Sequence, residues 1–452
     1  MKFLKFPFKK KPPSLPKSLL PRVRLKTFPG PGSVKLASEL KRFECPQITY
    51  VGGVFPVFLK KAHACNFYDV DGNRYLDLTS AFGVTGLGHG HPAVLKAMSH
   101  QARQMVHGMG DVHPNEVKVS LARKLSEITP GNLNQSIFSS TGFEAVESAL
   151  KTAVMHTKKT GVISFTGAYH GLGYGTLSVT HRADFKKPFL KQLGGFSHVV
   201  PFPDTRIYAN KATKVCMKAI ESAFKKARRS KHPVGAVLIE PIQGRGGIHS
   251  APPEFLKQLR TFCDEEKIVL IADEVFSGFG RTGSMFAVEK SGIVPDILCL
   301  GKGMANGFPV SACIGSTRVM HSWGASTGDS IHTSTFLGHP LGAAVSLAVI
   351  KEIEERKLAD RAGNMGDLFR KELWKLKEKY PLIADVRGSG LMIGIEFKEK
   401  AGQFIAESLR GGVVLLPSGP THDVISVTPP LIIGEKEILY CVSLFDRILS
   451  KI

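Results

Sequence analysis

The chain has 452 residues, of which 43% are hydrophobic and 22% charged, so it can bury a sizeable core and is neither a small module nor a disordered protein. Its 60 Lys and Arg outnumber its 38 Asp and Glu and give a formal net charge of +22, which would attract a polyanion or an anionic substrate. Its seven cysteines form no C-x-x-C pair and no apolar run reaches the length of a membrane span, which predicts a soluble, cytoplasmic protein without a disulfide framework or a thiolate metal site.

The N-terminal segment is basic and rich in proline. Residues 1–38 contain ten Lys and Arg and no acid, which leaves a charge of +12 for residues 39–452. A segment of this composition buries little apolar surface, so we predict an extended arm over residues 1–35. A solvated tail is the simpler interpretation of this arm, and docking or contact with an anion is the alternative.

A β-hairpin and two helices are predicted next. Residues 67–78, FYDVDGNRYLDL, alternate apolar and polar side chains around a central Asp-Gly, which is typical of two strands joined by a tight turn. Residues 92–106 and 115–128 have the apolar spacing of helices, with a proline at or next to the start of each.

The middle of the chain alternates short apolar runs with helical segments, which predicts an α/β fold with a mostly parallel sheet. Runs such as VGAVLIEPI and KIVLIADEV are apolar at successive positions, as strands covered by helices on both faces must be. The predicted strands are 135–139, 161–165, 234–242, 268–275 and 296–300, and the predicted helices are 144–158, 210–229 and 253–266.

Beyond about residue 333 the pattern changes again. Long amphipathic helices over 341–379, followed by strand–turn signals around 384–397 and 411–428, predict a smaller α+β unit. We therefore divide the chain into four parts, which are the arm (1–35), an N-terminal part of the small domain (36–80), a large domain (81–338) and the C-terminal small domain (339–452).

Candidate site residues follow the predicted strands, because ligands bind at the carboxyl ends of the strands in a parallel sheet. The segment Ser140–Phe143 precedes a helix and suits an anion, although Ser/Thr-Gly is equally an ordinary helix cap. Later strands are followed by Tyr169 in GAYHG, by Glu240-Pro and a Gly-rich loop, by Asp273, and by Lys302 between two glycines.

An anion cradle, a flat aromatic ring, a buried carboxylate and a lysine are together what pyridoxal phosphate (PLP) needs. The lysine holds the PLP aldehyde as a Schiff base, and the carboxylate keeps the ring nitrogen protonated so that the ring accepts electrons. The aromatic side chain stacks on the ring. A desolvated lysine is otherwise costly, which makes Lys302 the central candidate.

With these motifs, the chain resembles the class III (ornithine/4-aminobutyrate-type) aminotransferases, which are PLP enzymes of fold type I. The resemblance covers nearly all of the chain after about residue 36. Its matching stretches include STGFEAVESALK, LIADEVFSGFGRTG, PDILCLGKGMANGFPVSA, HTSTFLGHPLGAA and VRGSGLMIGIEF. It implies PLP-dependent transfer of an amino group from an amino acid or amine to an oxo-acid acceptor, in a homodimer with shared active sites.

The resemblance also implies a role for each matching residue. Lys302 would form the Schiff base and move the α-proton, and Asp273 would pair with the ring nitrogen. Gly142 and Phe143 would donate backbone N–H groups to the phosphate, and Tyr169 and Val275 would contact the two ring faces. Thr335 would reach the phosphate of the neighbouring subunit, and Arg387 would hold the substrate carboxylate, a bidentate task that suits Arg better than Lys.

Two positions depart from the family pattern. Arg245 stands where many ω-aminotransferases have the Glu of a GEGG loop, which covers the carboxylate-binding arginine. Two arginines cannot form that switch, so either Arg387 stays free or Arg245 adds a second anion site. Phe276 stands where Gln is common beside the phenolic oxygen of PLP. Both departures bear on the substrate and leave the cofactor prediction unchanged.

Two other functions stay open from the sequence. A PLP-dependent racemase, epimerase or aminomutase would keep the cofactor, and the missing GEGG glutamate motivates this alternative. A polyanion-binding protein on an inactive scaffold is motivated by the basic arm. With transamination as the leading hypothesis, we expect a small amino donor and an oxo acid as partners, and no metal, membrane or nucleic acid.

Overall fold

The computed structural model describes residues 14–24, 27–50, 52 and 55–452. Its centre is a seven-stranded sheet that is parallel except at β12, which runs antiparallel to both of its neighbours. In order across the sheet, the strands are β4 (Leu133–Ser139), β12 (Ser311–Ser316), β11 (Ile297–Leu300), β10 (Val269–Asp273), β7 (Val234–Ile239), β5 (Gly161–Phe165) and β6 (Ser197–Val200). The predicted α/β fold with a mostly parallel sheet is confirmed.

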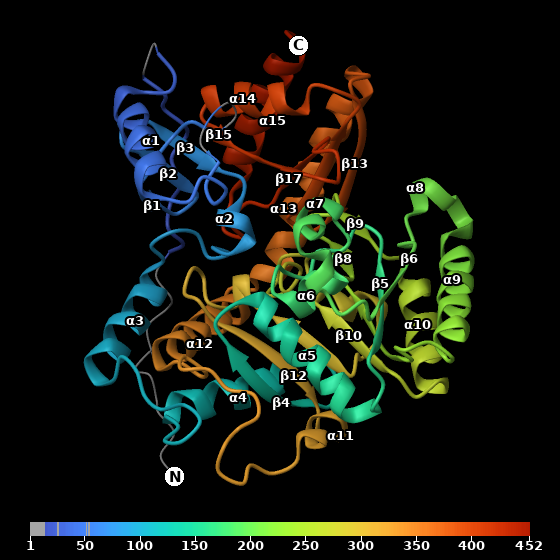
Figure 1. Ribbon diagram of the computed structural model, residues 1–452. Coiled ribbons are helices and arrows are strands. Elements are labelled where there is room, and N and C mark those ends of the chain that lie inside the picture. The colour runs from blue at the N-terminus through green and yellow to red at the C-terminus, as the bar shows by residue number, and fades with distance from the viewer. Residues whose placement is uncertain (1–13, 25–26, 51, 53–54) are drawn as a thin grey trace.

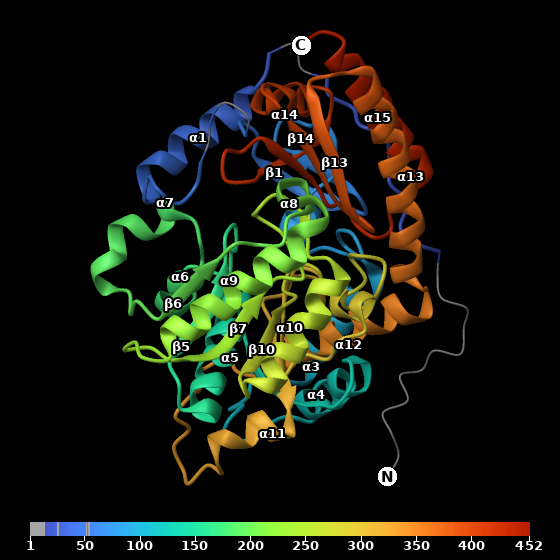
Figure 2. The same ribbon diagram turned by 90° about the vertical axis from the view of Figure 1, so that its right-hand side faces the viewer.

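Helices cover both faces of this sheet, which explains why its strands are apolar at successive positions. Val269 and Ile271 of β10 pack in one cluster with helix α5 (Gly142–Thr157). Leu270 and Ala272 point the other way, into a cluster with helices α9 (Ala212–Ala227) and α10 (Pro253–Glu265). Figure 1 shows α5 across one face, and Figure 2 shows α9 and α10 on the opposite side.

The remaining helices of the large part of the molecule lie around these layers. Helix α12 packs against α3 and α4, and α4 packs against β4 at the edge of the sheet. These helices and the short ones are α2 (Ser80–Gly83), α3 (Pro92–Gln104), α4 (Glu116–Ile128), α6 (Tyr174–Val179), α7 (Ala183–Lys186), α8 (Thr205–Tyr208), α11 (Thr317–Met320) and α12 (Pro340–Glu355), with 3-10 turns η1 (Lys187–Gln192), η2 (Ala209–Lys211), η3 (Ala287–Ser291), η4 (Lys302–Met304) and η5 (His321–Trp323).

Two smaller sheets lie outside the large one, and the first of them combines strands from both ends of the chain. The predicted hairpin is confirmed as β2 (Asn66–Asp69) and β3 (Arg74–Asp77), with β1 (Leu59–His63) beside β2 and β15 (Val413–Val414) parallel to β3. The second sheet consists of β13 (Ile383–Ser389), β14 (Met392–Phe397), β17 (Val424–Val427) and β16 (Leu416–Ser418), and helices α13 (Leu358–Lys379), α14 (Ala401–Arg410) and α15 (Glu435–Leu449) accompany it. A two-stranded pair, β8 (Ile242–Gln243) with β9 (His249–Ser250), completes the strands of the described residues.

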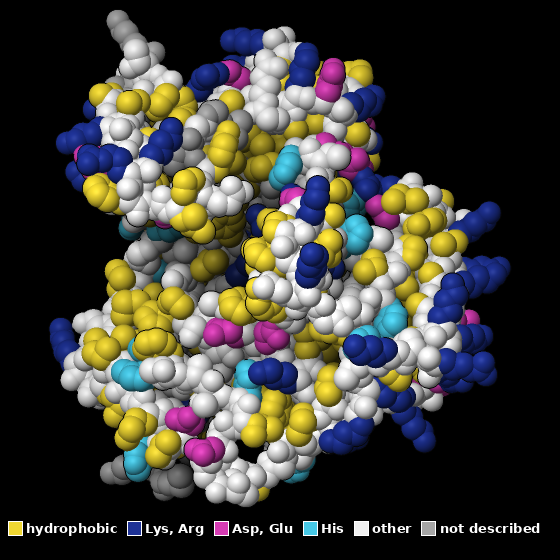
Figure 3. Space-filling model, viewed as in Figure 1, with side chains coloured by type: hydrophobic (Ala, Val, Ile, Leu, Met, Phe, Trp, Pro, Cys, Tyr) yellow, Lys and Arg dark blue, Asp and Glu magenta, His cyan; other side chains and the backbone are white. Residues whose placement is uncertain are grey.

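In Figures 1 and 2 the first β-hairpin and the C-terminal elements lie together above the large sheet. The space-filling view shows the surface hollowed where these upper elements meet the lower ones (Figure 3). The same view shows Lys and Arg gathered at the edge where Figure 1 places α9, whose Lys214, Lys218, Lys225 and Lys226 are exposed. Among the described residues, no helix is both long enough and apolar enough to cross a membrane.

The described part of the basic arm is docked on the first hairpin. The backbones of Arg22 and Arg74 exchange two hydrogen bonds of 2.8 and 3.0 Å. The side chain of Asn66 holds the backbone of Leu19 through two hydrogen bonds of 2.7 Å. The prediction of an extended segment up to residue 35 was wrong at its end, because helix α1 (Pro31–Phe43) begins with a proline that suits the first turn. Residues 1–13 of the arm lie outside the described residues.

Candidate active site

Lys302 directly follows β11, at the carboxyl ends of the parallel strands. Its φ is 41°, a left-handed backbone conformation that a non-glycine residue adopts only under constraint. Its Nζ lies 4.0 Å from the centre of the Phe276 ring, and among the described residues it makes no hydrogen bond or ion pair. Burial lowers the pKa of Lys302 to about 8, with Arg245 acting in the same direction and Asp273 and Glu240 opposing it. A larger fraction of this amine is therefore neutral and nucleophilic near physiological pH than in an exposed lysine.

Asp273 is the last residue of β10, and only 5% of it is exposed. Its Oδ2 lies 2.7 Å from Nδ1 of His170, and its Oδ1 accepts a hydrogen bond of 3.1 Å from the backbone N–H of Val275. His170 is buried as well, and its Nε2 has no partner among the described residues. The buried His170 therefore orients the Asp273 carboxylate.

Glu240 is a residue beside the site for which no role was predicted from the sequence. It lies just beyond β7, where its two carboxylate oxygens each accept a backbone hydrogen bond of 2.9 Å, one from Tyr169 and one from Gly244. Burial raises the pKa of Glu240 to about 7. Glu240 thus ties the loop of Tyr169 to the loop of Arg245. The only sequence signal was a carboxylate directly after an apolar strand.

The N-terminus of α5 lies beside these loops. Thr141 caps the helix, and Glu144 closes a capping box by accepting hydrogen bonds from the Thr141 N–H and hydroxyl at 2.8 and 2.9 Å. The N–H groups of Gly142 and Phe143 are in the first turn and have no intrahelical acceptor. A Cβ on Gly142 would lie 2.7 Å from the Val275 side chain, so only glycine permits this close approach.

Phe276 fills the space between two glycines. A Cβ on Gly83 or on Gly244 would lie 2.2 Å from a carbon of its ring. The ring also packs on the buried cluster of Ile242, Ile248 and Met392. Lys302 therefore has an apolar neighbour in Phe276, at the position where Gln is common in the family pattern.

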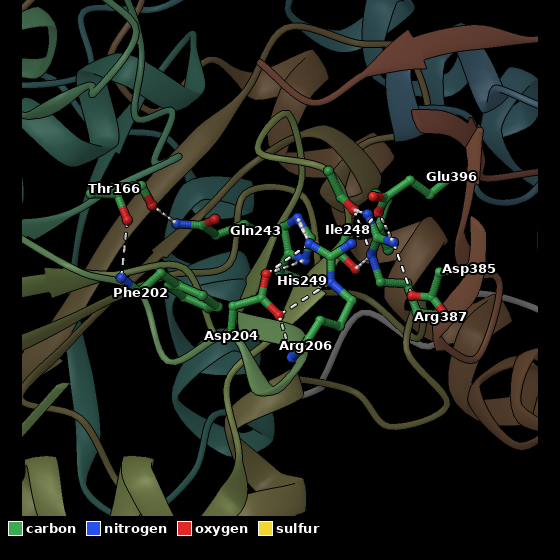
Figure 4. A network of polar contacts seen from close by, with 11 residues as sticks. Thr166, Phe202, Asp204, Arg206, Gln243, Ile248, His249, Asp385, Arg387 and Glu396 are labelled. Atoms are coloured by element: carbon green, nitrogen blue, oxygen red, sulfur yellow. Dashed lines mark hydrogen bonds and ion pairs between the residues drawn. The ribbon is translucent and has the colours of Figure 1, made fainter. Parts of the chain in front are cut away.

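The two predicted substrate arginines have different surroundings. Arg387 of β13 donates to the Gly247 and Ile248 carbonyls and forms ion pairs with Asp385 at 3.0 Å and Glu396 at 2.5 Å (Figure 4). Arg245 lies with its guanidinium 4.7 Å from the centre of the Tyr169 ring and 5.7 Å from that of Phe185. Arg245 is exposed, whereas the Arg387 side chain is only 12% exposed.

Thr335 lies in the exposed loop between η5 and α12. Its neighbour Thr333 donates a hydrogen bond of 2.6 Å to Asp111. Among the described residues of this single chain, no hydrogen bond joins Thr335 to Lys302 or to the N-terminus of α5. The structure thus places the predicted site residues around the carboxyl ends of the strands, with two exceptions. Thr335 lies in a separate exposed loop, and Arg387 is held in a network with Asp385 and Glu396.

The residues of the site fit PLP. They offer an amine without a hydrogen-bonding partner, a carboxylate fixed by a buried histidine, and two free N–H groups at a helix N-terminus, where an anion is stabilised. Gly142 and Gly301 both lie against the Val275 side chain, which brings the N-terminus of the helix close to the residue that precedes Lys302. Lys302 would hold the PLP aldehyde, Asp273 the ring nitrogen, and Gly142 and Phe143 the phosphate.

Comparison with known proteins agrees with this arrangement. Residues 49–449 match the family model "Aminotransferase class-III". The chain is 34% identical to the acetylornithine aminotransferase of Caldanaerobacter subterraneus subsp. tengcongensis, over 88% of this chain and 96% of the relative. It is also 34% identical to the 4-aminobutyrate aminotransferase of Escherichia coli, over 86% of this chain and 92% of the relative.

Solved structures resemble the whole fold. A transaminase from the marine bacterium Virgibacillus superposes with a TM-score of 0.84 at 27% identity, over 92% of this chain and 98% of that one. An amine transaminase from an uncultivated Pseudomonas species, in its PLP-bound form, superposes with a TM-score of 0.83 at 28% identity, over 91% of this chain and 98% of that one.

Proposed function

Because the chain belongs to the class-III aminotransferase family and catalyses PLP-dependent transamination, we propose that Lys302 and Asp273 are its catalytic residues. The observation that carries this proposal is the state of Lys302, whose amine is held without a hydrogen-bonding partner on a constrained backbone and has its pKa lowered to about 8. The left-handed backbone also occurs at exposed lysines of the chain, as at Lys158 and Lys267, so the property that distinguishes Lys302 is the loss of hydration that lowers its pKa.

When bound, PLP supplies an aldehyde that condenses with amines and a ring that withdraws electrons from the substrate's Cα. Lys302 Nζ would hold this aldehyde, and as a free amine it would be the base that accepts the proton from the substrate Cα. Asp273, oriented by His170 at 2.7 Å, holds a proton on the ring nitrogen. Tyr169 and Val275 fix the ring plane, and Gly142 and Phe143 bind the phosphate.

The substrates proposed are an amino acid with a free carboxylate and an oxo-acid acceptor. The names of the relatives, which act on acetylornithine and 4-aminobutyrate, support a carboxylate-bearing amino donor. Arg387 and Arg245 are the candidate receptors for that carboxylate, because guanidinium groups bind carboxylates with two parallel hydrogen bonds.

A homodimer with shared sites is also part of the proposal. Its support is an exposed apolar surface near the loop of Thr335, where between 43% and 58% of Met105, Val106, Met109 and Phe336 is exposed. Contiguous exposed apolar side chains of this kind mark protein interfaces. Sedimentation equilibrium should give twice the mass of the chain, and a monomer that retains full activity would contradict shared sites.

Replacement of Lys302 by Ala tests the catalytic assignment. We expect Lys302→Ala to reduce turnover of an amino donor and an oxo acid by about 10²-fold or more, because the proton acceptor is lost. Borohydride reduction followed by peptide mass spectrometry should find PLP attached to Lys302 in the wild type and to no residue in the variant. PLP attached to a different lysine of the wild type would refute the assignment. Accumulation of a D-amino acid from an L-amino acid, without an oxo acid, would indicate a racemase instead.

A further inference from the structure

Arg387 lies in a network that already satisfies its charge. Its Nη1 contacts Asp385 at 3.0 Å and Glu396 at 2.5 Å, and its Nε and Nη2 donate to the Gly247 carbonyl at 2.9 and 2.6 Å. A bidentate substrate carboxylate needs donors of this same guanidinium edge. The incoming carboxylate would therefore have to displace contacts that the protein makes itself.

The network around Arg387 has no net positive charge. It contains two guanidiniums, since Arg206 pairs with both Asp204 and Glu396. These face the carboxylates of Asp204, Asp385 and Glu396, so negative groups outnumber positive ones (Figure 4). His249 contributes no charge near neutral pH, because burial and the two arginines lower its pKa to about 4. A further carboxylate brought to Arg387 would meet like charges.

Arg245, in contrast to Arg387, has no carboxylate paired with it among the described residues. Its guanidinium contacts the Tyr169 and Phe185 rings, and among the described residues its side chain has no hydrogen bond or ion pair. A guanidinium stacked on an aromatic face keeps its N–H donors at the edge, in the plane where a carboxylate binds. The position lies beside the candidate site, since the guanidinium stacks 4.7 Å from the centre of the Tyr169 ring, whose backbone is tied to the loop of Arg245 through Glu240.

We propose that Arg245, rather than Arg387, binds the carboxylate of the amino-acid substrate, an inference that rests on the proposed function. Arg387 is a positioning residue, which fixes the loop of Arg245 through the Gly247 and Ile248 carbonyls. A glutamate at position 245 would repel the substrate carboxylate, whereas the arginine attracts it. Donors and acceptors with a free carboxylate are therefore the substrate class, and simple amines are poor substrates.

Pairs of donors that differ only in the carboxylate test the proposal on the holoenzyme. In butylamine a methyl group replaces the carboxylate of 4-aminobutyrate, and isopropylamine is related to L-alanine in the same way. We expect Arg245→Met to raise KM for the carboxylate member of a pair by about 10- to 100-fold, because a charge-assisted bidentate contact is lost. KM for the matched amine should stay within about twofold, which is ordinary for a surface change. Arg245→Lys should give an intermediate rise, because it keeps the charge and loses the fork.

Arg182→Met is the matched control. Arg182 also lies on an aromatic face, 4.7 Å from the centre of the Phe185 ring, but it is already paired with Asp184. Its replacement should leave the KM ratio of each pair unchanged. An unchanged ratio in Arg245→Met would overturn the proposal while transamination itself stands. If the wild type turned over none of these donors with any oxo acid, the proposed function would fail instead.

Chemical labelling tests the same inference without a variant and without turnover. Phenylglyoxal modifies accessible guanidinium groups, and peptide mass spectrometry reports each site. We expect Arg245 to react at least about tenfold faster than Arg387, as free and ion-paired guanidiniums should differ. Butyrate should slow the labelling of Arg245, and the uncharged butyramide should not. Protection of Arg387 by butyrate with no effect on Arg245 would assign the carboxylate site to Arg387.

Discussion

The side chain of Phe276 occupies the space that two glycines leave beside Lys302. Its ring is 4.0 Å from the amine, and a side chain at Gly83 or Gly244 would collide with it. The three residues therefore depend on one another, since a larger residue at either glycine requires a smaller one at Phe276. The apolar ring offers the amine no hydrogen-bond acceptor, and burial is the main cause of the lowered pKa of Lys302.

The lowered pKa of Lys302 predicts how fast the PLP-free protein captures its cofactor. Only the neutral amine attacks an aldehyde, and the neutral fraction rises about tenfold per pH unit below the pKa and then levels off. With the pKa at about 8, the capture rate should rise from pH 6 to about 8 and change little above it. Stopped-flow absorbance, with borohydride trapping on Lys302, measures this rate.

A blocked lysine, N-acetyl-lysine amide, is the control for ionisation of PLP itself. Its rate should continue to rise toward the ordinary lysine pKa of about 10.4, and the ratio of the two rates isolates the effect of the protein. A protein rate that still rises steeply between pH 9 and 10 would contradict a desolvated amine at Lys302.

At the scale of elements, the sequence predicted β4, β5, β7, β10 and β11 of the large sheet, but it placed the ends of β7 and β10 too late. The apolar run expected over 234–242 ends as β7 at Ile239, and the run expected over 268–275 ends as β10 at Asp273. In both cases the chain leaves the sheet where the site begins. Glu240 accepts hydrogen bonds from backbone N–H groups of two loops, and the Val275 N–H donates to Asp273. Apolar composition continues past these points because the walls of the site are apolar too.

Strand β12 was not predicted. Its sequence, SACIGS, is short and rich in small residues, and it lacks the β-branched alternation that marks a strand. It pairs antiparallel with β4, which lies 172 residues earlier in the chain, counted from Ser139 to Ser311. Such pairing depends on distant partners that local sequence does not contain.

The same limit applies to the candidate site. Lys302, Asp273 and Tyr169 were predictable because each follows a recognisable strand in a specific motif. The closed state of Arg387 was not predictable, because it requires Glu396 to lie opposite Asp385 across β13 and β14. Of the two alternatives that the sequence left open, a free Arg387 differs from the structure, in which the carboxylates of Asp385 and Glu396 pair with it, and a second anion site at Arg245 stays a prediction.

At the scale of the whole molecule, Arg281 connects parts of the chain that are far apart in sequence. It is 2% exposed, and its guanidinium donates to the Leu391 carbonyl and the Ser80 hydroxyl at 3.2 Å and to the Pro429 carbonyl. In the domain division that we retain as a proposal, these partners belong to 36–80 and 339–452, and Arg281 belongs to 81–338. Burial lowers the pKa of Arg281 to about 10, so its charge persists at neutral pH.

Replacement of Arg281 by Met should therefore destabilise the molecule more than an ordinary arginine replacement. Three buried acceptors lose their donor, and each unsatisfied group costs about 1–3 kcal/mol, so we expect the free energy of unfolding to fall by roughly 3 kcal/mol or more. Arg361→Met is the control, since Arg361 is only partly buried and donates to the neighbouring carbonyls of Ile432 and Ile433 within one part of the chain. Urea unfolding of the holoenzyme measures both variants. An equal, small loss of unfolding free energy in the two variants would show that Arg281 does not couple the large domain to the elements above it. A normal PLP content in Arg281→Met would show that PLP binding does not depend on the contacts of Arg281.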